Sequence, residues 1–206
     1  MWPLKHIFNK SAETWIIPAD WKSANVTAIR KKGNRQETGN YRPISLTSVV
    51  CKTMERLIKG KIIAHLEGNN LIGDSQHGFR SKRSCLTSLL DFFARVIDTY
   101  DTGNNKAVEL IYVDFQKAFD KVPDERLIVK VMSHFIQGGA ARWIWLAGRR
   151  QRVCINQTFS CWTAVTSGVP QGSVPGPLFF LVYINDLDNG IVTKEYILVP
   201  RIYSLV

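Results

Sequence analysis

The clearest strand signal in the chain is an apolar run near its middle, Leu110–Val113, which ends at Asp114. A continuous run of β-branched, aromatic and aliphatic residues predicts a strand that is buried on both faces. A carboxylate at the end of such a strand is costly to bury unless it is hydrogen-bonded or holds a cation. Asp114 is therefore interpreted in two ways: as a common turn residue, or as a ligand at the mouth of a sheet.

Apolar residues at helical spacing predict several helices around this strand. The first is short and is closed off by Pro18; the second has Gly68 as a C-cap candidate; the third begins near Ser84. Core packing is the interpretation adopted for the second stripe. In chain order, the three stripes are Leu4, Ile7, Phe8 and Trp15; Val50, Met54, Leu57, Ile58, Ile62 and Leu66; and Leu86, Leu89, Leu90, Phe93, Val96 and Ile97, with further helices expected over 127–135 and 140–147.

Two further segments predict hairpins. Residues 25–30 alternate between polar and apolar, and residues 41–44 return as an extended piece because Pro43 disfavours a helical conformation at Arg42. Residues 149–155 and 158–165 resemble a second hairpin that turns at 156–157. Helices mixed with hairpins around one buried strand indicate an α+β fold.

Charge changes this picture by pointing to a partner. The 206 residues carry 27 Lys and Arg against 17 Asp and Glu, a net charge of +10. Residues 1–83 hold 15 of the basic and 6 of the acidic residues, so nearly all of the excess lies in the first part of the chain. Such a distribution suggests an anionic partner such as nucleic acid, and the alternative is a basic surface that serves only solubility.

Cysteine usage and apolar runs bear on location. Cys51, Cys85, Cys154 and Cys161 form no Cys-x-x-Cys pair, which favours reduced cysteines in an intracellular protein. The longest apolar run, Pro177–Ile184, is too short to span a bilayer, and the N-terminus lacks a signal-peptide core. We therefore expect a cytoplasmic or nuclear protein that is not secreted and contacts no membrane. The sequence indicates no specific protein partner.

Four motifs in order carry a family resemblance: NYRPIS at 40–45, QHGFRSKR at 76–83, VELIYVDFQKAFDKV at 108–122 and TSGVPQGSVPGPLFFLVYINDL at 166–187. They resemble reverse transcriptases of non-LTR retrotransposons of the LINE type, in particular the jockey-like ones. The resemblance extends from about Leu4 to Ile191. In the last motif these relatives usually have leucine where this chain has Pro175, a substitution that the first turn of a helix tolerates.

The resemblance implies the fingers and part of the palm of a right-hand polymerase, with an incomplete sheet. Residues 1–105 would be fingers-like, basic and mostly helical with a hairpin near 25–45. Residues 106–194 would be a partial palm that contains the Asp114 strand and the Gly- and Pro-rich loop 167–177. Residues 195–206 resemble nothing in the family and would be an aberrant tail.

The same resemblance assigns the catalytic metal site. Asp114 would be the first metal-binding aspartate, and Phe115 would offer its backbone carbonyl to the second Mg²⁺. Hard oxygen ligands of this kind suit two divalent cations that clamp the reacting oxygens in phosphoryl transfer. Phe119 would be the aromatic gate against a ribose 2′-hydroxyl as well as a packing residue. Asp120 is left out of the site as structural.

Nucleotide and nucleic-acid contacts follow from the resemblance as well. Gln171 and Gly172 would lie against the incoming nucleotide and the template base. Lys32 and Arg42 would face the triphosphate, for which the fork of an arginine is well suited. Template-backbone contacts are expected at Arg80 and Arg83. The implied partners are an RNA template, a DNA primer and deoxynucleoside triphosphates.

One expected motif is absent from the sequence. The family carries a Phe/Tyr-Ala-Asp-Asp turn about twenty residues after the Tyr183–Leu187 segment, and these 206 residues contain no Ala-Asp-Asp. One aspartate cannot plausibly hold two divalent cations. The prediction is therefore a reverse transcriptase fragment that is catalytically inactive. The alternatives are a non-catalytic nucleic-acid-binding remnant and a pseudogene-like product without function.

Overall fold

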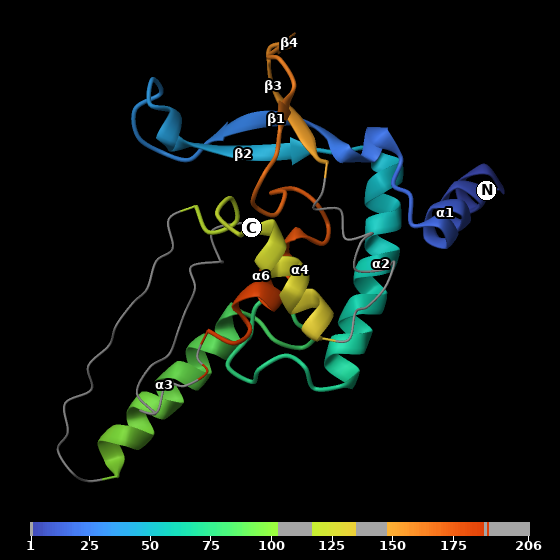
Figure 1. Cartoon of the computed structure of the whole chain (residues 1–206). Coiled ribbons are helices and arrows are strands. Elements are labelled where there is room, and N and C mark those ends of the chain that lie inside the picture. Colours follow the sequence, from blue (N-terminus) through green and yellow to red (C-terminus); the bar gives the residue numbers. More distant parts are fainter. Residues whose placement is uncertain (1, 103–116, 135–147, 188, 190–206) are drawn as a thin grey trace.

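The computed structural model describes residues 2–102, 117–134, 148–187 and 189. Five helices and five strands in these ranges give a mixed α+β arrangement, in which a sheet lies across one end of a group of helices (Figure 1). This confirms the predicted α+β class. The helices are α1 (Trp2–Thr14), α2 (Val49–Gly68), α3 (Cys85–Asp101), α4 (Asp124–Ser133) and α6 (Gly176–Ile184), and the strands are β1 (Ser23–Arg30), β2 (Tyr41–Leu46), β3 (Arg150–Ile155), β4 (Thr158–Phe159) and β5 (Thr163–Ala164).

The sheet joins segments that are far apart in the chain. Its order is β2-β1-β3-β4, and β5 also pairs with β3. β1 is antiparallel to β2, as the predicted first hairpin requires, and parallel to β3, with Ser23 opposite Arg150 and Val26 opposite Val153. The predicted second hairpin is confirmed by the β3–β4 pairing. Its turn places Asn156 at φ 47° and Gln157 at φ 64°, the left-handed pair that a tight two-residue hairpin loop needs.

The main core lies between three helices. α6 is apolar on every side and is almost wholly buried, and α2 and α4 pack around it. The fully buried side chains that share this core include Leu66, Val122, Leu127, Val131, Leu178 and Leu181. A smaller cluster of Ile17, Trp21, Cys51 and Met54 ties α1 and the following segment to α2, with Phe8 edge-on to Trp21.

Two predicted apolar stripes are largely exposed in the described structure. On α3 only Phe92 is buried, whereas Leu86, Leu89, Leu90, Phe93 and Ile97 are exposed. α3 extends away from the other helices (Figure 1), so no described element covers that face. On the first helix, Leu4 and Ile7 are exposed and the helix ends at Thr14, because Trp15 adopts a left-handed conformation.

Most element boundaries match the prediction closely. α2 covers the expected span, with the difference that Gly68 is its last residue and Asn69 is the C-cap. α3 begins after Ser84, whose side chain and that of Thr87 form a capping box. Pro175 is the N-cap of α6, so the helix starts directly after it. The predicted strand at 110–113 and helix at 140–147 lie outside the described residues.

Helix length and hydropathy decide whether a helix can span a membrane. None of the helices in the described ranges is both long enough and apolar enough to cross a bilayer.

Candidate functional site

The candidate site is built around the Gly- and Pro-rich loop between β5 and α6. This loop packs directly on β2: the Ser45 amide donates to the Gln171 carbonyl at 2.7 Å. Gly172 follows with φ +105°, and a Cβ there would lie 2.7 Å from the Ser45 carbonyl oxygen. Only glycine permits both the backbone conformation and the close approach. The loop is therefore fixed to the β1–β2 hairpin at Gln171.

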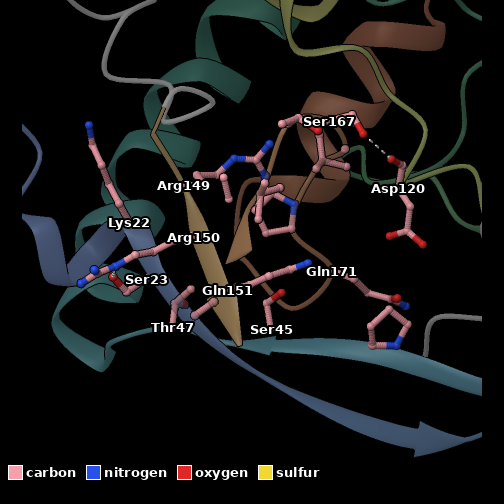
Figure 2. A pocket seen from close by; sticks show the side chains of 18 of the residues that line it. Lys22, Ser23, Ser45, Thr47, Asp120, Arg149, Arg150, Gln151, Ser167 and Gln171 are labelled. Carbon is pink, nitrogen blue, oxygen red and sulfur yellow. Dashed lines mark hydrogen bonds between the residues drawn. The ribbon is translucent and has the colours of Figure 1, made fainter. Parts of the chain in front are cut away.

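The other end of the loop is fixed to the turn at 117–122. The Gly168 amide donates to the Val122 carbonyl at 2.7 Å, and the Val169 amide donates to the Phe119 carbonyl at 2.9 Å. The Ser167 hydroxyl donates to the Asp120 carbonyl at 3.2 Å (Figure 2). The loop thus bridges β2 and the turn at 117–122.

Phe119 is half-buried and packs on α6. Its ring stacks on Phe180 with centroids 4.6 Å apart and an angle of 17° between planes. This contact agrees with the predicted packing role of Phe119. The gating role stays a prediction, because it concerns a bound nucleotide.

Glu55, on α2, binds the backbone of the loop, and the sequence analysis did not identify this residue. It is 1% exposed, and its Oε2 accepts a hydrogen bond from the Val174 amide at 3.0 Å. Burial raises the pKa of Glu55, while the hydrogen bond from Val174 opposes the rise. Burial also raises the pKa of the neighbouring Cys51 thiol, and the negative charge of Glu55 raises it further. The available signal was position, since Glu55 lies between Cys51 and Ile58 on the apolar side of α2.

Glutamine at position 55 is expected to change the pH dependence of stability. A carboxyl with a raised folded-state pKa binds more protons when folded, so its contribution to stability is present below the ordinary value of 4.5 and is lost as pH rises through the folded pKa. Glu55→Gln keeps an acceptor for the Val174 amide and removes the titration. The difference in unfolding free energy between variant and wild type should therefore grow in favour of the variant above pH 4.5.

Urea denaturation followed by tryptophan fluorescence at several pH values measures this difference. Glu13→Gln, at an exposed position on α1, is the control. A difference between Glu55→Gln and wild type that does not change with pH would contradict the assignment.

A cavity of about 330 Å³ lies between the sheet and this loop (Figure 2). Its polar lining includes Lys22, Ser45, Gln151 and Gln171. At one wall, buried Arg149 places Nη2 3.1 Å from both carboxylate oxygens of Asp124, the first residue of α4. Burial raises the pKa of Asp124, and the Arg149 guanidinium opposes that rise.

The predicted phosphate-binding cations lie on the β1–β2 hairpin. Arg42 is half-buried on β2, opposite Ile29 of β1. Lys32 is exposed in the connection between these strands. Through the bond between Ser45 and Gln171, the strand that carries Arg42 is linked to the predicted nucleotide-contacting loop. Triphosphate binding by both cations stays a prediction.

Arg80 and Arg83 organise their own loop. Arg80 donates from Nη1 to the Gly73 carbonyl at 2.9 Å and more weakly to the Gln76 carbonyl. Arg83 pairs with Asp74 at 3.0 Å and also contacts His77, whose pKa is lowered by burial and by this guanidinium. These contacts supply a structural role. The predicted contacts to a template backbone stay untested.

The predicted metal ligands Asp114 and Phe115 lie outside the described residues. Within the described ranges, no group of three or more His, Cys, Asp or Glu side chains could hold a metal ion. Asp186 pairs with Lys130, whose hydrogen bond holds the pKa of that carboxyl below its usual range. The described residues alone therefore do not make a magnesium site.

Comparison with known proteins adds the family. The family model for reverse transcriptase (RNA-dependent DNA polymerase) matches residues 29–199. The chain is 32% identical to a probable RNA-directed DNA polymerase from transposon BS of Drosophila melanogaster, over 88% of this chain and 20% of that protein. It is 31% identical to the RNA-directed DNA polymerase from mobile element jockey of the same species, over 92% and 21%. The chain spans about a fifth of the length of these relatives.

Proposed function

Because the chain belongs to the reverse transcriptase family, as a domain of the non-LTR retrotransposon kind, we propose that it forms the fingers and the first part of the palm of an RNA-directed DNA polymerase. Its ligands in this proposal are an RNA template, a DNA primer and a deoxynucleoside triphosphate. We also propose that this polypeptide by itself lacks polymerase activity, since its sequence contains no Ala-Asp-Asp.

The observation that carries the proposal is the double attachment of the Gly- and Pro-rich loop. One attachment holds Gln171 against β2, the strand of Arg42, and the other holds Gly168 against the turn that contains Phe119. Segments separated by more than a hundred residues thus meet at one place. Glycine at 168 and at 172 permits these close backbone contacts, which fix the loop that carries Gln171 beside the turn that carries Phe119.

In this proposal each residue has a distinct role. Arg42 and Lys32 bind the triphosphate, Gln171 and Gly172 lie under the nucleotide, and Phe119 limits the space beside its sugar. Arg80 and Arg83 face the template backbone from the loop that they organise.

Magnesium would be held by Asp114 together with the Phe115 carbonyl. When bound, such ions stabilise the charge on the attacking and leaving oxygens of phosphoryl transfer. A complete two-metal site requires further carboxylates than Asp114 offers, because two divalent cations need several anionic oxygen ligands.

Primer extension on an RNA template, with magnesium or manganese present, tests the proposal. The expected result is binding of the template–primer without extension, and Arg42→Ala should weaken nucleotide crosslinking severalfold. Asp114→Ala is the control for any extension that appears. Extension that disappears in Asp114→Ala would overturn the proposed inactivity and show that other groups complete the metal site.

A second candidate function is nucleic-acid binding without catalysis. The observation that favours it is the concentration of positive charge in residues 1–83, where basic residues outnumber acidic residues by 15 to 6. Binding of this kind falls steeply with salt. Magnesium calorimetry separates the two candidates: identical weak titrations of wild type and Asp114→Asn would remove the metal site and leave the binding function.

A further inference from the structure

An alternating row of arginine and aromatic side chains runs along the β3 hairpin. Its order is Arg150, Trp162, Arg152 and Phe159, and we call these four residues the arginine–aromatic ladder. The guanidinium carbon of Arg150 lies 4.8 Å from the Trp162 ring centre. That of Arg152 lies 4.6 Å from the same ring centre and 3.9 Å from the Phe159 ring centre. Two cations therefore share one indole ring.

The strand register holds both arginines on one face of the sheet. Arg150 donates from Nε to the Ser23 hydroxyl at 2.8 Å, and Arg152 donates from Nε to the Asn25 side-chain oxygen at 2.8 Å. Each acceptor is the residue opposite on β1, and Figure 2 shows Arg150 reaching Ser23. A guanidinium has five N–H donors, so each arginine keeps four beyond these bonds.

Among the described residues, no carboxylate neutralises the positive charge of the ladder. In the described part of the chain, neither Arg150 nor Arg152 forms an ion pair with a carboxylate. Arg42 lies on the same face, because its partner Ile29 is an even number of positions from Asn25 along β1. Three arginines on one sheet face, two of them against one ring, create a potential that favours an anion.

The aromatic members are open to solvent. Trp162 is 40% exposed and Phe159 is 46% exposed, and the hairpin stands clear of the helices (Figure 1). Exposed rings give bases a surface on which to stack, and a guanidinium plane does the same while its N–H groups bind phosphate. A duplex hides the faces of its bases, so this chemistry favours unpaired strands.

We propose that the arginine–aromatic ladder binds single-stranded nucleic acid, with bases stacked on its rings and guanidinium planes and phosphates on its free N–H groups. The surface lies on the β3 hairpin, and its first member, Arg150, also lines the cavity between the sheet and the Gly- and Pro-rich loop. The inference rests on the proposed function only in that the chain must bind nucleic acid. An acidic peptide would satisfy the charge but would leave the stacking faces unused.

Fluorescence anisotropy with the full chain tests this inference. The probes are a labelled oligouridine RNA, which is unpaired, and a blunt duplex of the same charge per strand. Phe159→Ala with Trp162→Ala should weaken oligouridine binding by at least about tenfold and leave duplex binding within about twofold. Arg150→Gln with Arg152→Gln should reduce the salt slope for oligouridine by about 1.4, the value for two phosphate contacts on a single strand.

Matched variants control for loss of an exposed ring and of an exposed charge. Tyr100→Ala removes an exposed aromatic residue from α3, and Arg126→Ala removes an exposed arginine from α4. Both should bind oligouridine as wild type does. Circular dichroism of every variant establishes that it is folded, and Trp162→Phe, which keeps a ring, should retain most of the binding.

The outcomes separate the inference from the proposed function. If duplex and oligouridine bind and the double aromatic variant loses neither, the ladder is not the single-strand surface, while the proposed function stands. If the double aromatic variant binds oligouridine and duplex equally more weakly than wild type, the rings do not select unpaired strands, and the inference is overturned. An acidic peptide that competes as well as oligouridine also overturns it. If wild type binds neither probe, both proposals fail.

Discussion

Arg149→Ala is expected to destabilise the folded chain by about 3–5 kcal/mol, the usual result of removing one partner from a buried ion pair. Arg149 is 6% exposed and contacts both carboxylate oxygens of Asp124. The pair joins the start of β3 to the start of α4. Without the guanidinium, Asp124 stays half-buried with its charge uncompensated.

The pH dependence of this loss identifies its cause. Burial already raises the pKa of Asp124, and removal of the opposing Arg149 raises it further. The loss should therefore be smallest at low pH, where the Asp124 carboxyl is protonated, and should increase as pH rises. Urea denaturation at pH values on both sides of the Asp124 titration measures it.

Two comparisons guard this prediction. Arg126→Ala, on an exposed face of α4, removes the same charge and should change the unfolding free energy little. The double variant Asp124→Asn with Arg149→Met removes both charges and should cost less than Arg149→Ala alone. If the double variant loses as much unfolding free energy as Asp124→Asn and Arg149→Met lose together when measured singly, the pair does not act as a unit.

Gly168→Ala is the second change with a large expected effect, about 3 kcal/mol or more. Gly168 has φ +87°, and an added Cβ would lie 2.8 Å from the Asp120 carbonyl oxygen and 2.9 Å from the Phe119 carbonyl oxygen. Both contacts are with backbone, which cannot rotate away. The substitution must therefore separate the loop from the 117–122 turn, and Gln171 should lose its fixed place beside β2.

Gly60→Ala gives a matched comparison of opposite sign. Gly60 lies in the interior of α2, where a Cβ meets nothing within 4 Å. The change should stabilise the chain by about 0.5–1 kcal/mol through helix propensity. Thermal unfolding by circular dichroism measures both variants. A Gly168→Ala protein as stable as wild type would mean that the loop is not held at this junction.

Local patterns predicted much of the fold. The apolar period and Ser84 located α2 and α3, and the residue alternation located β1, because these signals depend only on near neighbours. Burial of a stripe was harder to predict, since it depends on what the helix meets. The exposed Leu86 and Leu90 on α3 show this difference.

The supports of the site could not be predicted, because they join distant segments. Glu55 lies 119 positions from Val174, and Asp124 lies 25 positions from Arg149. No local sequence pattern predicts that these residues are in contact. The loop residues Gln171 and Gly172 were recognised because their motif is contiguous, and the same is true of Arg42.

The parallel pairing of β1 with β3 has a consequence for synthesis of the chain. β1 and β2 are complete at Leu46, but the strand that covers the other edge of β1 begins only at Arg150. At typical translation rates this interval is on the order of 10 s. Throughout it, the β1 edge presents unpaired backbone groups to other nascent chains. Translation products that end before Arg150 should therefore aggregate, and those that extend past Ile155 should not share that weakness.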